Sequence, residues 1–335
     1  MRSTAATTTA ELFRVEDRAF HAVLGDDPRL ELVVATDAHE GPVYVPGEDA
    51  LYFTTLPRPT DLPAPGYRLV AINRLELDGD RFPLEPERVT TLVERTNVAN
   101  GMTLDRAGRL VVCEQGTRSE HAAIGRLDPA SGRHETLVDH WCGLRLNSPN
   151  DVVVASDGVI WFTDPGYGYL QGFRPEPQVG DFVYRYDPHA DRLTVVADGF
   201  DKPNGLAFSP DESVLYVTDS GANQEAGSYH VGRPHHIQAF DVAGGRRLVN
   251  RRLFAVTTPG FPDGIKVDSE GRVYASAFSG VQVFTPDGDL LGEIHLPGAV
   301  NFTFGGADRN VLFVLADDAI WAATLAGTGV AAPGT

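Results

Sequence analysis

The sequence of 335 residues has little cysteine, an excess of acidic over basic residues and no long hydrophobic run. Two cysteines, Cys113 and Cys142, are too few for a disulfide framework, so we expect both to be reduced and mostly buried. No stretch of about 18 apolar residues could span a membrane, and the first residues, MRSTAATTTAELF, contain no apolar core of signal-peptide length. We therefore expect a soluble, cytoplasmic protein whose residues 1–10 form a disordered tail.

The shortage of basic residues excludes two classes of partner. There are 28 Lys and Arg against 46 Asp and Glu, which gives a net charge of −18. Such a surface repels phosphate backbones and anionic lipid headgroups, so nucleic acid and the membrane surface are not expected partners. The sequence also lacks the G-x-S-x-G, H-E-x-x-H, P-loop and G-x-G-x-x-G motifs, so nothing supports a serine nucleophile or nucleotide chemistry.

Glycine and proline, by contrast, are plentiful at 35 and 23 residues, which predicts many tight turns. One pattern recurs along the chain: a short alternating apolar run, a turn rich in Asp and Gly, and a second apolar run. This pattern is typical of a β-hairpin. The six copies span residues 41–54, 101–114, 151–164, 205–219, 264–276 and 302–316. No amphipathic helix separates the strands, which argues against a βαβ fold.

Each hairpin is followed by two further strand-like stretches, so the repeat is a four-stranded unit. Six such units predict an all-β fold, a six-bladed β-propeller with four-stranded blades around a central channel. We expect a single domain over residues 11–330, in which residues 11–20 form a short helix or an edge strand. The last unit is short of strands, so residues 29–36 (RLELVVAT) are predicted to supply its outer strand and close the ring. A β-sandwich is the alternative, but six equal hairpins favour radial symmetry.

A carboxylate or carboxamide residue stands just before each repeat. The innermost strands of a propeller line its channel, so these side chains should point at the axis from one end. Two carboxylates in a narrow channel repel and are costly to desolvate, and a divalent cation resolves both problems. Oxygen ligands favour a hard cation, Ca²⁺ above Zn²⁺. A single Asn-Gly or Asp-Gly pair indicates only a turn, but six polar residues at one phase of a repeat indicate a metal site. We call them the polar ring: Glu40, Asn100, Asn150, Asn204, Asp263 and Asn301.

Several of these segments resemble the senescence-marker-protein/gluconolactonase/LRE-like family of six-bladed propellers. The matching segments are 40–44 (EGPVY), 146–168, 202–223, 261–276 and 301–306, and residues 167–177, 183–188 and 197–205 are closer still to its lactonohydrolase branch. The resemblance covers about residues 38–325. It implies hydrolysis of an aldonate or pantoyl lactone with one bound divalent ion, usually Ca²⁺, with Zn²⁺ or Mn²⁺ as alternatives. It also implies that the metal ligands are Glu40, Asn150, Asn204 and Asp263.

The resemblance leaves Asn100 and Asn301 to contact the substrate or metal-bound water. We expect Asp263 to act as the general base, because a carboxylate at the edge of the metal can accept a proton from water. Tyr167 is expected at the mouth of the channel as a substrate-binding residue. His39 adjoins Glu40 but should point away from the channel by strand alternation.

Other interpretations stay open at this point. The histidines of the loop at 221–236 (His230, His235 and His236) are a rival source of the base, and Glu114 is expected to be a surface carboxylate. A phosphotriester or organophosphate could be hydrolysed at the same metal. A non-catalytic propeller scaffold is the third interpretation, although a scaffold does not need converging carboxylates. The partner is expected to be a small-molecule lactone, and a homodimer is left open.

Overall fold

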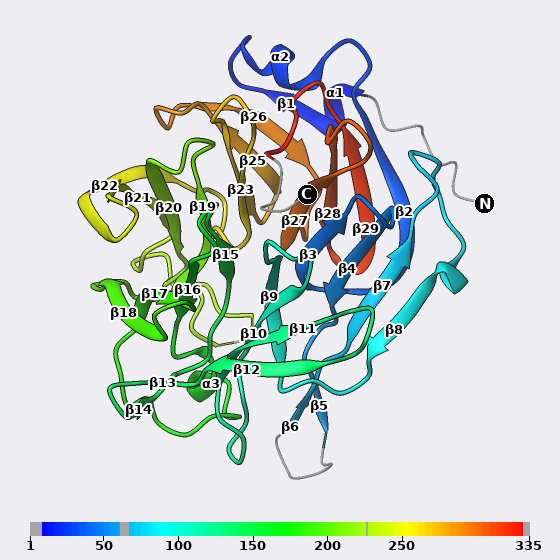
Figure 1. Cartoon of the computed structure of the whole chain (residues 1–335). Coiled ribbons are helices and arrows are strands. Elements are labelled where there is room, and N and C mark those ends of the chain that lie inside the picture. Colours follow the sequence, from blue (N-terminus) through cyan, green and yellow to red (C-terminus); the bar gives the residue numbers. More distant parts are fainter. Residues whose placement is uncertain (1–8, 61–66, 226, 331–335) are drawn as a thin grey trace.

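The computed structural model describes residues 9–60, 67–225 and 227–330. It consists almost entirely of β-strands in six sheets around one axis, which confirms the predicted six-bladed β-propeller (Figure 1). The first strands of the six sheets each contact the next one around the circle, so together they surround the axis. Each sheet then runs from this inner strand outward.

The strands of each blade follow one another in the chain. Blade 1 contains β3 (Glu40–Val45), β4 (Ala50–Thr54), β7 (Ile72–Glu76) and β8 (Val89–Val93), and blade 2 contains β9 (Ala99–Leu104), β10 (Leu110–Glu114), β11 (Ala123–Leu127) and β12 (His134–Val138). Blade 3 contains β15 (Val152–Val154), β16 (Ile160–Asp164), β17 (Phe182–Asp187) and β18 (Arg192–Ala197). Blade 4 contains β19 (Pro203–Phe208), β20 (Val214–Asp219), β21 (His236–Ala243) and β22 (Arg247–Val256). Blade 5 contains β23 (Ile265–Val267), β24 (Val273–Ala277), β25 (Gly280–Phe284) and β26 (Leu290–His295).

Blade 6 combines strands from both ends of the chain: β27 (Asn301–Gly305), β28 (Val311–Leu315), β29 (Asp317–Thr324) and, as its outer strand, β2 (Arg29–Ala38). The stretch at 29–36 therefore lies within β2, which pairs antiparallel with β29. Before it, α1 (Thr9–Leu12) leads into the edge strand β1 (Phe13–Val15) on β26, followed by α2 (Phe20–Leu24). Of the expected tail 1–10, residues 1–8 lie outside the described residues, and Thr9 and Ala10 belong to α1.

The place of a strand in its blade explains its hydrophobic pattern. Second strands such as β10 (LVVCE) and β28 (VLFVL) are buried along their whole length, and their sequences are apolar apart from Glu114 at the end of β10. The outer strand β22, by contrast, is mostly exposed. Each of the six clusters of buried apolar side chains draws on two neighbouring blades. Burial of one large apolar side chain stabilises the folded state by about 2 kcal/mol. Because these side chains are buried between two blades, each blade depends on its neighbours for stability.

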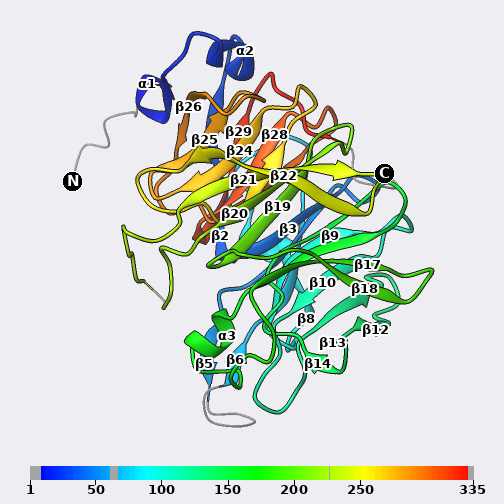
Figure 2. The ribbon, with the colours of Figure 1, turned by 90° about the vertical axis from the view of Figure 1, so that its left-hand side faces the viewer.

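Short elements interrupt several of the connections between strands. They are β5 (Arg58–Thr60) with β6 (Tyr67–Leu69) between β4 and β7, η1 (Pro86–Arg88) between β7 and β8, β13 (His140–Trp141) with β14 (Leu144–Arg145) between blades 2 and 3, and α3 (Tyr167–Leu170) between β16 and β17. The β5–β6 ribbon and α3 lie side by side (Figure 2), where Arg68 Nη2 donates to the carbonyl oxygen of Gln171 at 3.3 Å. No helix among the described residues is long and apolar enough to cross a membrane. Both cysteines are free, but only Cys113 is buried, because Cys142 is exposed.

Candidate active site

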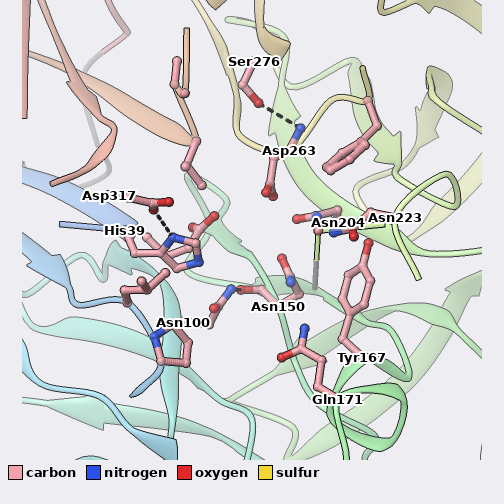
Figure 3. A pocket seen from close by; sticks show the side chains of 18 of the residues that line it. His39, Asn100, Asn150, Tyr167, Gln171, Asn204, Asn223, Asp263, Ser276 and Asp317 are labelled. Carbon is pink, nitrogen blue, oxygen red and sulfur yellow. Dashed lines mark hydrogen bonds and ion pairs between the residues drawn. The ribbon is translucent and has the colours of Figure 1, made fainter. Parts of the chain in front are cut away.

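One end of the central channel opens into a cavity of about 590 Å³. Five residues of the polar ring line it, and each lies within two residues of the start of its blade's inner strand. Figure 3 shows four of them converging on one volume. Four of the five are buried and one, Asp263, is half-buried. The five lining residues are Glu40, Asn100, Asn150, Asn204 and Asp263.

Asn301, the sixth member of the polar ring, supports the Glu40 carboxylate. Its side-chain amide donates to Glu40 Oε2 at 2.7 Å, and its own oxygen accepts the backbone N–H of Phe302 at 2.7 Å. Glu40 Oε2 also accepts the N–H of Gly41 at 3.0 Å. Both hydrogen-bonding groups of Asn301 are therefore engaged, and the residue acts on the pocket by holding Glu40.

Asp263 is held by the second strands of two blades. Its backbone N–H donates to Ser276 Oγ on β24 at 2.9 Å, as Figure 3 shows. Its carbonyl oxygen accepts the hydroxyl of Thr218 on β20 at 3.2 Å. These bonds fix the main chain and leave the carboxylate directed into the cavity.

The bond from Thr218 belongs to a set that repeats around the propeller. In three places a fully buried threonine at the end of a second strand donates its hydroxyl to the carbonyl of the polar-ring residue in the next blade. Such bonds fix the angle between neighbouring blades at the point where the site is built. The sequence carries a signal for them, because a threonine recurs at the ends of the repeats at 41–54, 151–164 and 205–219. The pairs are Thr54 with Asn100 (3.2 Å), Thr163 with Asn204 (2.6 Å) and Thr218 with Asp263 (3.2 Å).

The two carboxylates of the polar ring raise each other's cost of ionisation. Burial, together with the negative charge of Asp263, raises the pKa of Glu40 to about 8. Burial raises the pKa of Asp263 to about 7; the Asn204 amide opposes this by hydrogen bonding, and the charge of Asp151 adds to it. Asp151 itself is buried beneath the site, with its Oδ1 accepting the N–H of Val152 at 2.9 Å. A divalent cation between Glu40 and Asp263 would reverse these shifts, because it favours the ionised form of both.

The Asn150 side chain gives the second sign that a cation fits here. Its Oδ1 atom is buried and has no hydrogen-bond partner among the described residues. A buried oxygen without a partner costs about 1–3 kcal/mol, so such an atom in a native protein needs an explanation. A metal ion that accepts this lone pair would supply one.

The donor set also indicates which cation fits. Among the described residues there is no group of three or more His, Cys, Asp and Glu side chains that could hold a metal ion. The four candidate ligands instead supply two carboxylates and two carboxamides, all oxygen donors. Such a set suits Ca²⁺, which accepts carboxylate and amide oxygens at variable geometry, better than Zn²⁺, which prefers nitrogen and sulfur.

His39 also lines the pocket, contrary to the expectation from strand alternation. Its Nδ1 lies 2.7 Å from Asp317 Oδ1, and Figure 3 shows the ring extending into the pocket. Strand alternation does not apply to His39, because this residue lies in the one-residue connection between β2, which ends at Ala38, and β3, which begins at Glu40. Just after it, Gly41 takes a φ of 59°. A side chain at Gly41 would also come within 2.5 Å of the Asn100 carbonyl oxygen. Asp317 on β29 was not found by sequence reasoning, since nothing local links it to residue 39.

The remaining predicted residues divide into two groups. Tyr167 lines the pocket and donates its hydroxyl to the carbonyl of Ser220 at 3.3 Å, whereas its neighbour Tyr169 is 48% exposed. Glu114 is not the surface carboxylate that was expected: it is buried, and its Oε1 lies 2.5 Å from His134 Nε2. His39 is the only histidine among the described residues that line the cavity, so the loop histidines do not contribute to it.

Comparison with known proteins agrees with this site. Residues 38–318 match the family described as SMP-30/Gluconolactonase/LRE-like region. The chain belongs to the SMP-30/gluconolactonase/LRE-like family. It is 31% identical over 319 residues to the lactonohydrolase oryL of Aspergillus oryzae, which covers 89% of this chain and 70% of that one. It is 34% identical over 201 residues to the gluconolactonase of Zymomonas mobilis, which covers 58% of this chain and 54% of that one.

A solved structure supports the same membership. The chain superimposes on a gluconolactonase from Xanthomonas campestris with a TM-score of 0.76 and 36% identity, over 93% of this chain and 94% of the other. The family match begins at Ala38 and ends at Asp318, so it includes the whole polar ring as well as Asp317. The strands that precede residue 38, including most of β2, lie outside it.

Proposed function

We propose that this protein is a hydrolase that opens a small lactone, of the aldonolactone or pantolactone type, at a divalent cation. Glu40, Asn150, Asn204 and Asp263 would hold the cation, with Ca²⁺ favoured. The relatives named as lactonohydrolase and gluconolactonase support the reaction. The observation that carries the cation is the buried Asn150 Oδ1, which has no hydrogen-bond partner among the described residues and lines the same cavity as two carboxylates whose pKa values are raised. The proposal includes a cytoplasmic location and a small-molecule substrate without nucleic acid or membrane.

When bound, a divalent cation would polarise the lactone carbonyl and stabilise the negative charge that develops on its oxygen. Besides holding the cation, the residues of the chain then have two tasks. Asn100 and Tyr167 line the cavity and would orient the lactone ring. Asp263 would accept the proton of the attacking water, because its main chain is fixed by Ser276 and Thr218 and its carboxylate faces the cavity.

His39 is the second group that could accept this proton. Asp317 fixes its Nδ1, so the Nε2 atom is the one left for a ligand. The two candidates are separated by variants. Asp263→Asn should leave the fold intact and remove most turnover, whereas His39→Gln should retain most of it if Asp263 is the base. Full activity in Asp263→Asn would exclude Asp263 as the general base. The matched control is Asp289→Asn, because Asp289 is exposed on the opposite rim of blade 5.

The function itself is tested by a proton-release assay over a panel of lactones, with added Ca²⁺ and with chelator. We expect turnover of at least one lactone with Ca²⁺ and its loss after complete metal removal. If every lactone is inert in the presence of the metal, the proposal is wrong. Activity that survives metal removal would exclude the role given to the polar ring. A phosphotriester in the same panel tests the alternative reaction, and inertness toward both classes would leave the scaffold interpretation.

A further inference from the structure

One wall of the pocket is aromatic, although nothing in the polar ring requires it. Phe261 and Phe278 line the cavity and meet edge to face, with ring centroids 5.2 Å apart and planes at 77°. The ring of Tyr229 lies 5.2 Å from that of Phe278. We call these three side chains the aromatic wall.

The aromatic wall is built on the same two segments that position Asp263. Phe261 precedes Asp263 by two residues, and Phe278 follows Ser276, which binds the Asp263 main chain, by two. Gly260, with a φ of 99°, makes room for the ring of Phe278, because a Cβ atom there would come within 2.5 Å of it. Figure 3 shows Asp263 and Ser276 across the pocket from Gln171. The wall is therefore attached to the side of the pocket that carries the proposed base.

The aromatic wall is apolar but open to solvent. Phe278 is 46% exposed and Tyr229 is 39% exposed, and Leu56, another lining residue, is 36% exposed. Large apolar side chains gathered around a concave site are typical of a surface that a ligand covers. The cavity of about 590 Å³ is also within the range of about 300–1,000 Å³ that holds drug-sized ligands. A lactone ring held at the polar ring would leave free space along this wall.

We propose that the substrate is a lactone whose ring carries an apolar alkyl or aryl substituent, and that this substituent lies against the aromatic wall. This inference rests on the proposed lactonase function. It departs from the aldonolactone and pantolactone types in naming a more apolar class of lactone as the substrate. The polar ring takes the ester group and the wall takes the substituent, so the two halves of the pocket recognise the two halves of one molecule. Burial of one methylene group improves affinity about fourfold. A chain of five carbons that is half-buried should therefore improve kcat/KM by about 30-fold.

The test compares δ-valerolactone with δ-decalactone, which share one ring and differ only in a pentyl chain. With Ca²⁺ present, we expect kcat/KM to favour δ-decalactone by about 30-fold. Phe278→Ala should lower this ratio about tenfold, and Phe278→Leu should restore most of it, because a leucine keeps the surface apolar. The matched control is Leu253→Ala on the outer strand β22: Leu253 is 58% exposed, and its removal should leave both rates and their ratio unchanged.

The outcomes separate this inference from the function on which it rests. Equal kcat/KM for the two lactones in the wild type would overturn the inference and leave the lactonase function standing. An unchanged ratio in Phe278→Ala, with both lactones losing the same factor, would also overturn it, because the wall would then hold the lactone ring itself. If neither lactone nor glucono-δ-lactone is opened by the Ca²⁺-loaded protein, the proposed function fails and the inference fails with it.

Discussion

Replacing Asn150 by alanine distinguishes a metal ligand from an ordinary buried amide. Without a cation, the Oδ1 atom of Asn150 is buried and makes no hydrogen bond with the described residues. Removing a polar atom in that state relieves a desolvation cost, so Asn150→Ala should change the free energy of unfolding by less than about 1 kcal/mol. If the oxygen binds a cation, its removal lowers the affinity for that cation and the stability that binding provides.

The size of the effect follows from linkage between binding and folding. A ligand that binds only the folded protein stabilises it by about 2.7 kcal/mol when its free concentration is a hundred times Kd. An unfolding entropy of about 2.1 cal/mol/K per residue gives about 0.7 kcal/mol/K for 335 residues, so the wild-type Tm should rise by about 4 °C. If the variant binds a hundredfold more weakly, the same Ca²⁺ concentration stabilises it by about 0.4 kcal/mol, which is less than about 1 °C.

The assay is thermal unfolding with Ca²⁺ and with chelator. Asn73 on β7 offers a matched control. It is also buried, its Oδ1 also has no hydrogen-bond partner in the described part of the chain, and it lies on the third strand of blade 1 rather than at the axis. Asn73→Ala should shift Tm by the same amount in both conditions. A Ca²⁺-dependent rise in Asn150→Ala as large as in the wild type would refute the assignment of Asn150 as a ligand. Absence of any rise in the wild type at millimolar Ca²⁺ would refute the calcium site.

Two further predictions concern the support of the site and the outer part of blade 2. Thr163→Val removes the hydroxyl that donates to the Asn204 carbonyl, so it should lower the free energy of unfolding by about 1–3 kcal/mol and lower turnover. Thr91→Val, at an exposed position of β8, should change neither. Equal effects of the two variants in denaturant titration and in the activity assay would contradict this. The hydrogen bond with Glu114 raises the pKa of His134 above 6.5. Folding therefore favours the protonated form of His134. The stability that the wild type gains over His134→Gln should be fully present below about pH 6.5, and it should be lost as the pH rises through the pKa of His134 in the folded protein. Urea unfolding at several pH values checks this, and a difference that grows with pH would show the sign to be wrong.

The polar ring could be predicted from the sequence because its residues share one position in a repeat. Each residue stands next to the start of an inner strand, and every inner strand of a propeller faces the axis. The local pattern is then enough to predict that Glu40 and Asp263 meet, although they lie 223 positions apart in the chain. The pattern does not predict what each side chain of the ring contacts. Asn301 shows this, because its amide donates to Glu40 instead of facing the cavity.

The pair of His39 and Asp317 could not be predicted in this way. Its two residues lie 278 positions apart, and they meet only because β2 closes the last blade against β29. Strand alternation gave the wrong direction for His39, since the alternation rule requires a regular strand and His39 lies in the connection between β2 and β3. The prediction for Glu114 was wrong for a similar reason: its hydrogen-bond partner His134 belongs to the fourth strand of the same blade, 20 positions further along the chain.

The two halves of the pocket differ in how the sequence encodes them. The polar ring and its supporting threonines belong to the repeat, so the same bonds that join one blade to the next also aim the candidate ligands. The aromatic wall comes from the turn after β24 and from the loops before β21 and β23. These segments lie outside the repeat and can change without disturbing the bonds between blades. A propeller of this kind can therefore keep one reaction centre while its loops set the substrate, and the reaction is easier to predict from the sequence than the molecule on which it acts.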